Sequence, residues 1–330
     1  MHKVQGVGYF PDGVRLVTKE RSLLDNELLI EVAACGICGT DVHIIEGEQG
    51  SVATKEGTIL GHEYAGYVKE VGANTKGFSV GDLIAVDPNI YCHECPQCKN
   101  HQYNFCENML ALGVNIDGGF TDYCFVPYQQ AYKVNGEITA EEAAMMEPLA
   151  CCLRGMDQLD LKAGQSALII GAGTIGNMFA QLLKSSGLTV TVADINANKL
   201  KRLHELGIND TYDVSTQKLP DQNYNVVIET AGASTTTMSL AFEKASRGAQ
   251  ILMFSVPSGK AELDVRQIFE KELKIFGSFI NPGTNQRALD MIEKGLIDVK
   301  KLVTSEYSTS DFEAGLTAAK NGESLKVLIK

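Results

Sequence analysis

Residues 166–176 read Ser-Ala-Leu-Ile-Ile-Gly-Ala-Gly-Thr-Ile-Gly, and this stretch decides the predicted fold. In Ser166–Ile170 every residue after the serine is apolar, and a glycine follows the run directly. A continuous apolar run of this kind is typical of a strand buried on both faces of a parallel sheet. Thr174–Ser186 follows with apolar side chains at helical spacing. The glycine-x-glycine-x-x-glycine pattern therefore lies in a turn between a strand and a helix.

A turn of this kind, with a strand before it and a helix after it, is the fingerprint of dinucleotide binding. Gly171 permits the tight turn, Gly173 lets the backbone approach a pyrophosphate, and Gly176 lets the helix and the strand pack closely. The helix that begins at Thr174 and Ile175 would offer free N–H groups and a positive dipole end to the phosphates. We therefore predict that these five residues bind a dinucleotide, against the alternative of a turn with a purely structural use.

An acid follows the second predicted strand, Leu188–Ala193. It is Asp194, which lies 23 residues after Gly171. A carboxylate there accepts hydrogen bonds from a ribose 2′-hydroxyl and repels a 2′-phosphate, and residues 195–198 contain no arginine that would neutralise such a phosphate. The sequence therefore predicts NAD in preference to NADP. Lys199 is a further candidate for contact with a ribose hydroxyl, although a solvated helix lysine is the simpler interpretation.

Strands and helices alternate from about residue 165 to about residue 280, which predicts βαβ units and a doubly wound parallel sheet. The remaining predicted strands are Asn225–Glu229, Gln250–Phe254 and Ile275–Ser278, and the remaining helices are Ala197–Leu206 and Met238–Ser246. Residues 1 to about 150 instead contain short β-type runs divided by glycine, with one helical stretch at Thr139–Leu149. The last fifty residues contain helices at Gln286–Lys294 and Ser310–Lys320, and a strand-like run, Ser324–Lys330, that could rejoin the first sheet.

Length and charge limit the classes of function. The chain has 330 residues, enough for about two domains, and its 44% hydrophobic and 21% charged content excludes a disordered protein. Its formal net charge of −12 argues against a nucleic-acid partner or an anionic membrane surface. Neither a membrane span of about 18 apolar residues nor an apolar signal segment is visible. We therefore expect a cytoplasmic protein.

The chain has nine cysteines, and an odd number without a signal peptide argues for reduced thiols rather than a disulfide framework. Four of them follow the pattern C-x2-C-x2-C-x7-C, at Cys92, Cys95, Cys98 and Cys106. Four thiolates complete the tetrahedral coordination of zinc and leave no open position. The pattern therefore predicts a structural zinc site, against the alternative of four thiols that carry no metal.

A second, dispersed set contains one thiol, one imidazole and two carboxylates, at Cys38, His62, Glu63 and Glu147. These donors suit a zinc ion with a place left for water or substrate. Spacing alone leaves the alternatives open: Cys38 as a core thiol or as one half of a Cys35/Cys38 redox pair, His62 as a core histidine, and Glu147 as an acid at a helix end.

Taken together, several motifs resemble those of the zinc-dependent medium-chain dehydrogenase (alcohol dehydrogenase) family, in the same order and over essentially the whole chain. They are Gly36-Ile-Cys-Gly-Thr-Asp-Val-His43, Gly61-His-Glu-Tyr-Ala-Gly66, the four-cysteine lobe and the glycine turn. The polyol (sorbitol, xylitol and arabitol) dehydrogenase branch is similar to this chain at Glu147-Pro-Leu-Ala-Cys-Cys-Leu-Arg-Gly155, Asn281-Pro and Arg287-Ala-Leu. Threonine dehydrogenases share the Gly-Ile-Cys-Gly-Thr-Asp-x-His and Glu-Pro-Leu motifs.

The resemblance implies an α/β protein that combines a GroES-like, mostly-β catalytic domain with a Rossmann domain built on a doubly wound parallel sheet. Residues 1–150 would form the first part of the catalytic domain, with the structural zinc lobe at 92–106. Residues 151–280 would bind NAD, and residues 281–330 would return to the catalytic domain. The resemblance also implies a homodimer or homotetramer that assembles through the edge strands of the NAD domains.

Roles for individual residues are implied as well. Cys38 and His62 would bind the catalytic zinc, and Asp41 would orient His62. Glu63 and Glu147 would be the remaining acids, bound to the metal directly or through water.

The same resemblance implies that Thr40 and His43 carry the substrate proton towards solvent by way of a cofactor ribose hydroxyl. A turn hydroxyl and a surface histidine are the simpler alternatives for these two residues.

The implied function is transfer of a hydride from a small secondary alcohol, a polyol first of all, to NAD, with two zinc ions per chain. L-Threonine 3-dehydrogenase and sugar-alcohol-phosphate dehydrogenase are alternatives within the same class. A catalytically inert zinc- and NAD-binding scaffold or sensor is the alternative from a different class.

Overall fold

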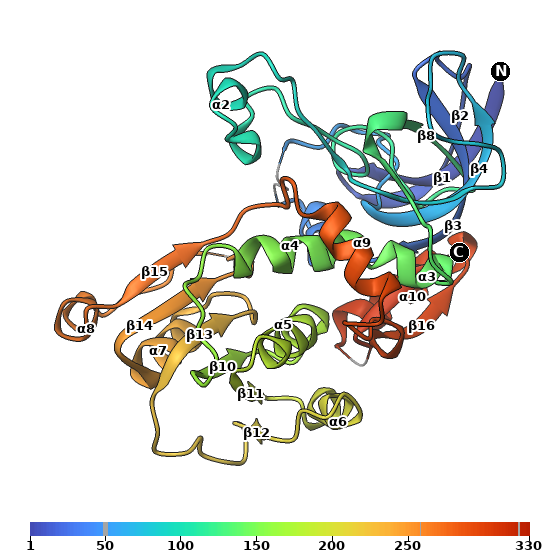
Figure 1. Ribbon diagram of the computed structural model, residues 1–330. Coiled ribbons are helices and arrows are strands. Elements are labelled where there is room, and N and C mark those ends of the chain that lie inside the picture. Colours follow the sequence, from blue (N-terminus) through green and yellow to red (C-terminus); the bar gives the residue numbers. More distant parts are fainter. Residues whose placement is uncertain (49–51, 258, 323) are drawn as a thin grey trace. The chain divides into compact units, whose positions relative to one another are not determined.

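The chain folds into two compact units in the computed structural model, which describes residues 1–48, 52–257, 259–322 and 324–330 (Figure 1). Unit 1 contains Met1–Ala150, Pro282–Gly295 and Val303–Lys330. Unit 2 contains Cys151–Asn281 and Leu296–Leu302. The chain therefore leaves unit 1 after its first half and later supplies that unit with two more segments.

Unit 2 is built on a six-stranded parallel sheet with the strand order β12-β11-β10-β13-β14-β15. The strands are β10 (Ser166–Ile170), β11 (Thr189–Asp194), β12 (Thr211–Asp213), β13 (Tyr224–Glu229), β14 (Ala245–Met253) and β15 (Lys274–Gly277). The helices are α5 (Thr174–Ser185), α6 (Ala197–Glu205), α7 (Thr235–Lys244) and α8 (Val265–Lys271). The order reverses direction between β10 and β13, so the predicted doubly wound Rossmann sheet is confirmed.

Several elements of unit 2 differ from the sequence prediction, among them α8, for which no helix was predicted. β12 has only three residues and no apolar run, so the sequence carried no strand signal for it. The predicted helix Met238–Ser246 extends too far, because α7 ends at Lys244 and β14 begins at the next residue, Ala245. The first part of β14 contains half-exposed or exposed polar residues and Gly248, whose φ is +74°, and this interruption hides the strand from a search for apolar runs.

The glycine turn after β10 requires glycine at two positions. Gly171 has a φ of +109°, a backbone conformation that residues other than glycine rarely adopt. At Gly176 a Cβ atom would lie 1.9 Å from the carbonyl oxygen of Gly171. The turn and the first turn of α5 can therefore pack closely only while both residues lack a side chain.

Unit 1 contains a sheet with the strand order β16-β17-β3-β4-β5-β9, and β8 pairs with β3 as well. Its strands are β3 (Glu27–Gly36), β4 (Glu63–Val71), β5 (Leu83–Val86), β8 (Tyr123–Pro127), β9 (Ala131–Lys133), β16 (Val303–Tyr307) and β17 (Lys326–Ile329). Two ribbons accompany it, formed by β1 (His2–Phe10) with β2 (Gly13–Arg21) and by β6 (Asn89–Ile90) with β7 (Leu110–Ala111). Together with the parallel sheet of unit 2, these sheets confirm the predicted α/β class.

The end of the chain joins this sheet, as the sequence predicted. β17 pairs antiparallel with β3, with Leu328 opposite Gly36 and Ile329 opposite Cys35. β16, which the sequence did not predict, pairs parallel with β17 and is only half-buried. Its mixed polar sequence, Val-Thr-Ser-Glu-Tyr, explains why it was missed.

The helices of unit 1 are short. They are α1 (Gly39–Ile45), α2 (Pro96–Lys99), α3 (Ala140–Ala144), α9 (Asn285–Glu293) and α10 (Phe312–Lys320). A further helix, α4 (Met146–Met156), begins in unit 1. Short 3₁₀ turns lie at Tyr103–Phe105, Tyr128–Gln130 and Thr309–Asp311 in unit 1 and at Lys300–Leu302 in unit 2. The predicted helix Thr139–Leu149 is divided at Met145, which ends α3. Among the described residues, no helix has both the length and the apolar character needed to cross a membrane.

Two glycine substitutions separate the structural and the binding roles of the turn. We expect Gly176→Ala to lower the stability of unit 2 by about 1–3 kcal/mol, because its Cβ collides with the backbone. Gly173→Ala meets no atom within 4 Å in the protein, so it should keep the stability and weaken binding of the predicted dinucleotide about tenfold or more. Thermal unfolding and NADH fluorescence titration measure the two effects. Normal NADH binding by Gly173→Ala would contradict the predicted role of this backbone.

Candidate functional site

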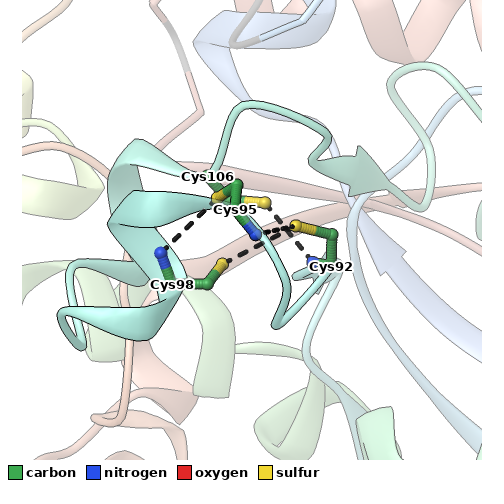
Figure 2. Close-up of side chains that lie close together, drawn as sticks. All are labelled: Cys92, Cys95, Cys98 and Cys106. Atoms are coloured by element: carbon green, nitrogen blue, oxygen red, sulfur yellow. Dashed lines mark hydrogen bonds between the residues drawn. The ribbon is translucent and has the colours of Figure 1, made fainter.

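The four-cysteine lobe of unit 1 brings its sulfur atoms together, as Figure 2 shows. The four Sγ atoms, from Cys92, Cys95, Cys98 and Cys106, all lie within 4.8 Å of one another. The backbone N–H groups point at the sulfurs: the amide of Cys92 donates to Cys106 Sγ over 3.3 Å, and the amide of Cys98 donates to Cys95 Sγ over 3.4 Å. Amide donors of this kind stabilise thiolates.

The charges of these thiols fit a metal ion. The amides of Glu94 and Cys95 donate to Cys92 Sγ and lower the pKa of that thiol to about 6. Burial, with side-chain hydrogen bonds from the Cys98 thiol to Cys106 and Cys95, raises the pKa of Cys98 to about 12. Four adjacent thiolates repel one another unless a cation lies between them. The donor set and its compactness therefore fit Zn²⁺ in a closed, structural site.

The second predicted set lies on α1 and β4 of unit 1. Cys38 directly precedes α1, His62 directly precedes β4, and Glu63 is the first residue of β4. Their ligand atoms lie within 4.8 Å of one another. His62 and Glu63 are buried, with 7% and 2% of their surfaces exposed, while Cys38 is half-buried. One thiol, one imidazole and one carboxylate are thus gathered where few water molecules can reach them.

Asp41 connects two members of this cluster. It is fully buried, and its Oδ2 accepts a hydrogen bond from the amide of Cys38 over 2.8 Å. Its Oδ1 lies 3.4 Å from Nδ1 of His62. Although burial opposes a charged imidazole, Asp41 and Cys38 raise the pKa of His62 well above its usual value. The contact turns Nδ1 towards Asp41, so Nε2 is the nitrogen left for a metal, in agreement with the predicted orienting role of Asp41.

Lys326 completes this cluster, and the sequence analysis missed it. The residue is buried on β17, forms an ion pair with Oε2 of Glu63 and donates a hydrogen bond to the carbonyl of Ile37 over 3.2 Å. Burial alone would lower the pKa of Lys326, but the charges of Glu63 and Cys38 raise it above its usual value. The only sign in the sequence that Lys326 belongs to this cluster is its position as a single lysine within the apolar terminal run.

Glu147 lies outside the compact group. It is buried in the first turn of α4, and its carboxylate is not among the ligand atoms of Cys38, His62 and Glu63 that lie within 4.8 Å of one another. Its charge nevertheless raises the pKa of Lys326. Its role as a metal ligand stays a prediction.

Thr40 and His43 both lie on α1 and are half-buried. The hydroxyl of Thr40 lies 3.8 Å from Sγ of Cys38. Nδ1 of His43 lies 2.7 Å from Oε2 of Glu48, a carboxylate that the sequence analysis did not single out. Thr40 is therefore beside a predicted metal ligand, and His43 is beside an exposed acid that can exchange protons with solvent.

The alternative interpretation of Cys35 and Cys38 as a redox pair is not supported by the surroundings of Cys35. Cys35 is fully buried on β3, and its burial raises the pKa of the thiol well above the usual value. Thiol–disulfide exchange needs a thiolate, which this environment disfavours.

A second buried polar group in unit 1 was also missed by the sequence analysis. Asp87 accepts hydrogen bonds from the amide of Asn89 over 3.0 Å and from Nδ2 of Asn285 over 2.8 Å. Burial, with a smaller contribution from Glu147, raises the pKa of Asp87 to about 7, although the amide of Asn89 opposes this shift. Burial and the charge of Asp87 likewise raise the pKa of Tyr132 to about 12.

In unit 2, the predicted dinucleotide residues surround the carboxyl ends of β10 and β11. Gly173 is the N-cap of α5, Thr174 is buried and Ile175 is half-buried. The Asp194 carboxylate ends β11 and accepts hydrogen bonds from the amides of Ala172, over 2.6 Å, and Asn196, over 2.7 Å.

These hydrogen bonds hold the Asp194 carboxylate beside the glycine turn, where each oxygen keeps a lone pair for a ribose hydroxyl. Lys199 is half-buried in the first turn of α6.

Comparison with known proteins identifies the family. Residues 24–136 match the alcohol dehydrogenase GroES-like domain, and residues 174–294 match the zinc-binding dehydrogenase family. The chain belongs to the zinc-dependent medium-chain dehydrogenases. This confirms the resemblance read from the motifs, and it shows that the chain is an oxidoreductase that acts on a small-molecule alcohol with zinc and a nicotinamide dinucleotide as cofactors.

Individual relatives of this dehydrogenase differ in substrate. An L-threonine 3-dehydrogenase from Shewanella frigidimarina (strain NCIMB 400) is 32% identical over 316 residues, 92% of each chain. A zinc-binding dehydrogenase from Sinorhizobium meliloti 1021, bound to NADP, has a TM-score of 0.93 and 31% identity over 100% of this chain and 99% of that one. Galactitol-1-phosphate dehydrogenase from Escherichia coli has a TM-score of 0.87 and 26% identity over 98% and 99% of the two chains.

The raised pKa of Asp87 predicts a specific pH dependence. In the unfolded chain Asp87 ionises near its usual pKa of 3.8, whereas in the folded protein it ionises at about 7. The folded state therefore binds the extra proton between these values, and stability falls as the pH rises from about 4 to about 7. Asp87→Asn cannot titrate, so its stability relative to the wild type should increase from about pH 4 to about pH 7, by about 1.4 kcal/mol for each pH unit, and should stay constant above that.

Thermal unfolding at several pH values measures this difference, and Asp82→Asn is the matched control. Burial opposes ionisation of Asp82, but hydrogen bonds from Lys133 and the amide of Ser79 lower its pKa below the usual value. It therefore stays ionised from pH 5 to pH 8, and its difference from the wild type should be constant. Parallel curves for Asp87→Asn and the wild type would show that Asp87 does not titrate in this range.

Proposed function

We propose that this enzyme oxidises a secondary alcohol of a polyol, of the sorbitol, xylitol or arabitol type, and transfers the hydride to NAD. The compact group of Cys38, His62 and Glu63 carries the proposal, because its mixed donors suit a zinc ion with an open position. Zinc bound there supplies a Lewis acid that lowers the pKa of the substrate alcohol, and NAD supplies the hydride acceptor. The polyol assignment rests on the motif around Glu147 and on Asn281-Pro.

The residues of the chain prepare this site. Asp41 fixes the orientation of His62, and Lys326 holds the carboxylate of Glu63. Thr40 and His43 would carry the substrate proton away from the site, and His43 lies beside Glu48, which is exposed to solvent. In this proposal Glu147 is the fourth donor of the site, bound to the metal directly or through water.

Unit 2 holds the cofactor by its glycine turn and by Asp194. NAD is preferred over NADP because the Asp194 carboxylate repels a 2′-phosphate and residues 195–198 contain no arginine to offset this repulsion. The relative from Sinorhizobium meliloti binds NADP, so cofactor preference is part of the test below. Lys199 contributes a contact to a ribose hydroxyl.

L-Threonine is the second candidate substrate, and the relative from Shewanella frigidimarina, 32% identical over 92% of the chain, favours it. Threonine and polyols share a secondary alcohol next to a second polar group on the neighbouring carbon. A sugar-alcohol phosphate is a third candidate, which the similarity to galactitol-1-phosphate dehydrogenase supports.

The proposed assembly is a homodimer or homotetramer that forms through the edge of the unit 2 sheet. β15 is an edge strand of that sheet, and α8, close to it in Figure 1, contacts β14. Two apolar side chains of α8 are exposed: Val265 by 70% and Phe269 by 83% of their surfaces. Two copies could pair their edge strands and cover these side chains.

The reduced thiols agree with a cytoplasmic location.

Alanine variants of two metal ligands test the mechanism. We expect Cys38→Ala and His62→Ala to lower kcat/KM by about 10³-fold or more, because the Lewis acid contributes several kcal/mol to the transition state. Zinc content should fall from about two ions to about one per chain, and NADH binding should stay within about twofold. Cys35→Ala, at a neighbouring buried thiol, is the matched control and should keep both zinc ions. Near-normal turnover in either ligand variant contradicts the assignment.

A substrate panel tests the proposed specificity. Sorbitol, xylitol, arabitol, L-threonine and galactitol 1-phosphate are each oxidised with NAD and with NADP, and the absorbance of the reduced cofactor gives kcat/KM. The proposal expects the highest value for a polyol with NAD. A higher value for L-threonine replaces the polyol assignment by the second candidate, and equal values with NADP contradict the role given to Asp194.

A further inference from the structure

Glu229, the last residue of β13 in unit 2, is a fully buried carboxylate with no part in the mechanism above. Its Oε1 accepts a hydrogen bond from the amide of Ala231 over 2.8 Å. Its Oε2 accepts a hydrogen bond from the hydroxyl of Ser255. A buried carboxylate is costly unless its oxygens have donors, and here both oxygens have one.

These bonds connect the segments that follow two neighbouring strands. Ser255 lies just beyond β14, and its Oγ also accepts a hydrogen bond from the amide of Gly232 over 2.9 Å. The carbonyl of Glu229 accepts a hydrogen bond from the amide of Phe254 over 3.1 Å. The side chains of Glu229 and Ser255 therefore hold residues 230–232, after β13, against residues 254–255, after β14.

Thr230 extends the network to the glycine turn. Its hydroxyl lies 3.0 Å from the carbonyl oxygen of Ile170 and 3.2 Å from that of Gly171, and both are acceptors. Its amide also donates to the carbonyl of Ile170, over 2.8 Å. The carboxyl ends of β10, β13 and β14 are thus linked by the side chains of Thr230, Glu229 and Ser255.

The strand order shows which half of a dinucleotide meets this network. In a doubly wound sheet the ligand lies across the carboxyl ends of the strands at the switch point, here between β10 and β13. The glycine turn after β10 takes the pyrophosphate, and Asp194 at the end of β11 takes the adenosine ribose. The nicotinamide half therefore extends in the opposite direction, over the ends of β13 and β14.

We propose that Glu229, acting through Ser255, is a positioning residue for the nicotinamide half of the bound cofactor. It fixes the backbone of residues 230–232 and 254–255 before the cofactor arrives, so that less conformational freedom is lost when the nicotinamide riboside binds. The adenosine half would contact a different part of the sheet edge, at the ends of β10 and β11, whereas the side-chain bonds of Glu229 and Ser255 reach residues 231 and 232 after β13. The inference rests on cofactor binding in unit 2 and is independent of which alcohol is the substrate.

Two substitutions break the network to different degrees. In Glu229→Gln an NH2 group replaces one carboxylate oxygen, so one of the two acceptors becomes a donor, and the bond from the amide of Ala231 or the bond from the hydroxyl of Ser255 is lost. Ser255→Ala removes the hydroxyl and keeps the carboxylate with its bond from Ala231. Ser255→Thr restores a hydroxyl at the same position and serves as the conservative rescue.

The experiment compares two ligands with full-length protein: NADH, which contains the nicotinamide half, and ADP, which contains only adenosine and the diphosphate. We expect Glu229→Gln and Ser255→Ala to raise the Kd of NADH about tenfold and to leave the Kd of ADP within about twofold. Ser255→Thr should recover most of the NADH affinity. Fluorescence titration gives the Kd of NADH, and competition against NADH gives that of ADP.

Asp210→Asn is the matched control, because Asp210 accepts a hydrogen bond from the Thr191 hydroxyl at the β11–β12 side of the same sheet. It should leave the ratio of the two Kd values unchanged. Equal weakening of NADH and ADP by Glu229→Gln would show a merely structural role and overturn the proposal, as would unchanged NADH binding. If Glu229→Gln does not fold, Ser255→Ala and Ser255→Thr decide the question. A different preferred alcohol would alter the proposed substrate and none of these affinities.

Discussion

The ion pair between Glu63 and Lys326 is the constraint on which unit 1 depends. Both side chains are buried, and they are 263 positions apart in the sequence. A buried charge that loses its partner costs about 3–5 kcal/mol, so the two residues must meet whenever the unit is folded. This requirement brings β17, the last strand, onto β3, which separates it from β4, after the chain has completed unit 2. The return of the chain to unit 1 is thus tied to the predicted metal-binding cluster itself.

The same cluster has an excess of acidic groups. Asp41, Glu63 and the Cys38 thiol lie around His62, and the charge of Glu147 acts on Lys326 from α4. Lys326 and the imidazole of His62, whose pKa is raised, are the cations that face these groups. A divalent cation among Cys38, His62 and Glu63 would take the place of the imidazole proton and would provide the Lewis acid of a dehydrogenase. The charges of the folded unit therefore agree with the proposed metal site, as the donor types do.

Local motifs were predictable from the sequence because their geometry is set by neighbouring residues. The four-cysteine lobe and the turn that begins at Gly171 each lie within a short segment whose spacing defines the site. The cluster of Cys38 and His62 depends instead on the register of β3 with β4, which places Gly36 opposite Glu63. Spacing alone could not select that arrangement, and only the resemblance to a family suggested it. Lys326 and Glu229 were missed because each reads as an ordinary residue of a strand until its buried partner is known.

The two predicted metal sites of unit 1 illustrate why a catalytic centre would draw on distant segments. The lobe of Cys92 and Cys106 takes its ligands from one loop, and four thiols fill the coordination of a zinc ion completely. The cluster at Cys38 combines residues that precede a helix and begin a strand, and Lys326 competes for one of its carboxylates. In the proposed site Glu63 would be shared between a metal ion and Lys326, so the protein would offer fewer strong ligands than the four thiols of the lobe. The ion pair that fixes the last strand would thus help to leave a position for the alcohol.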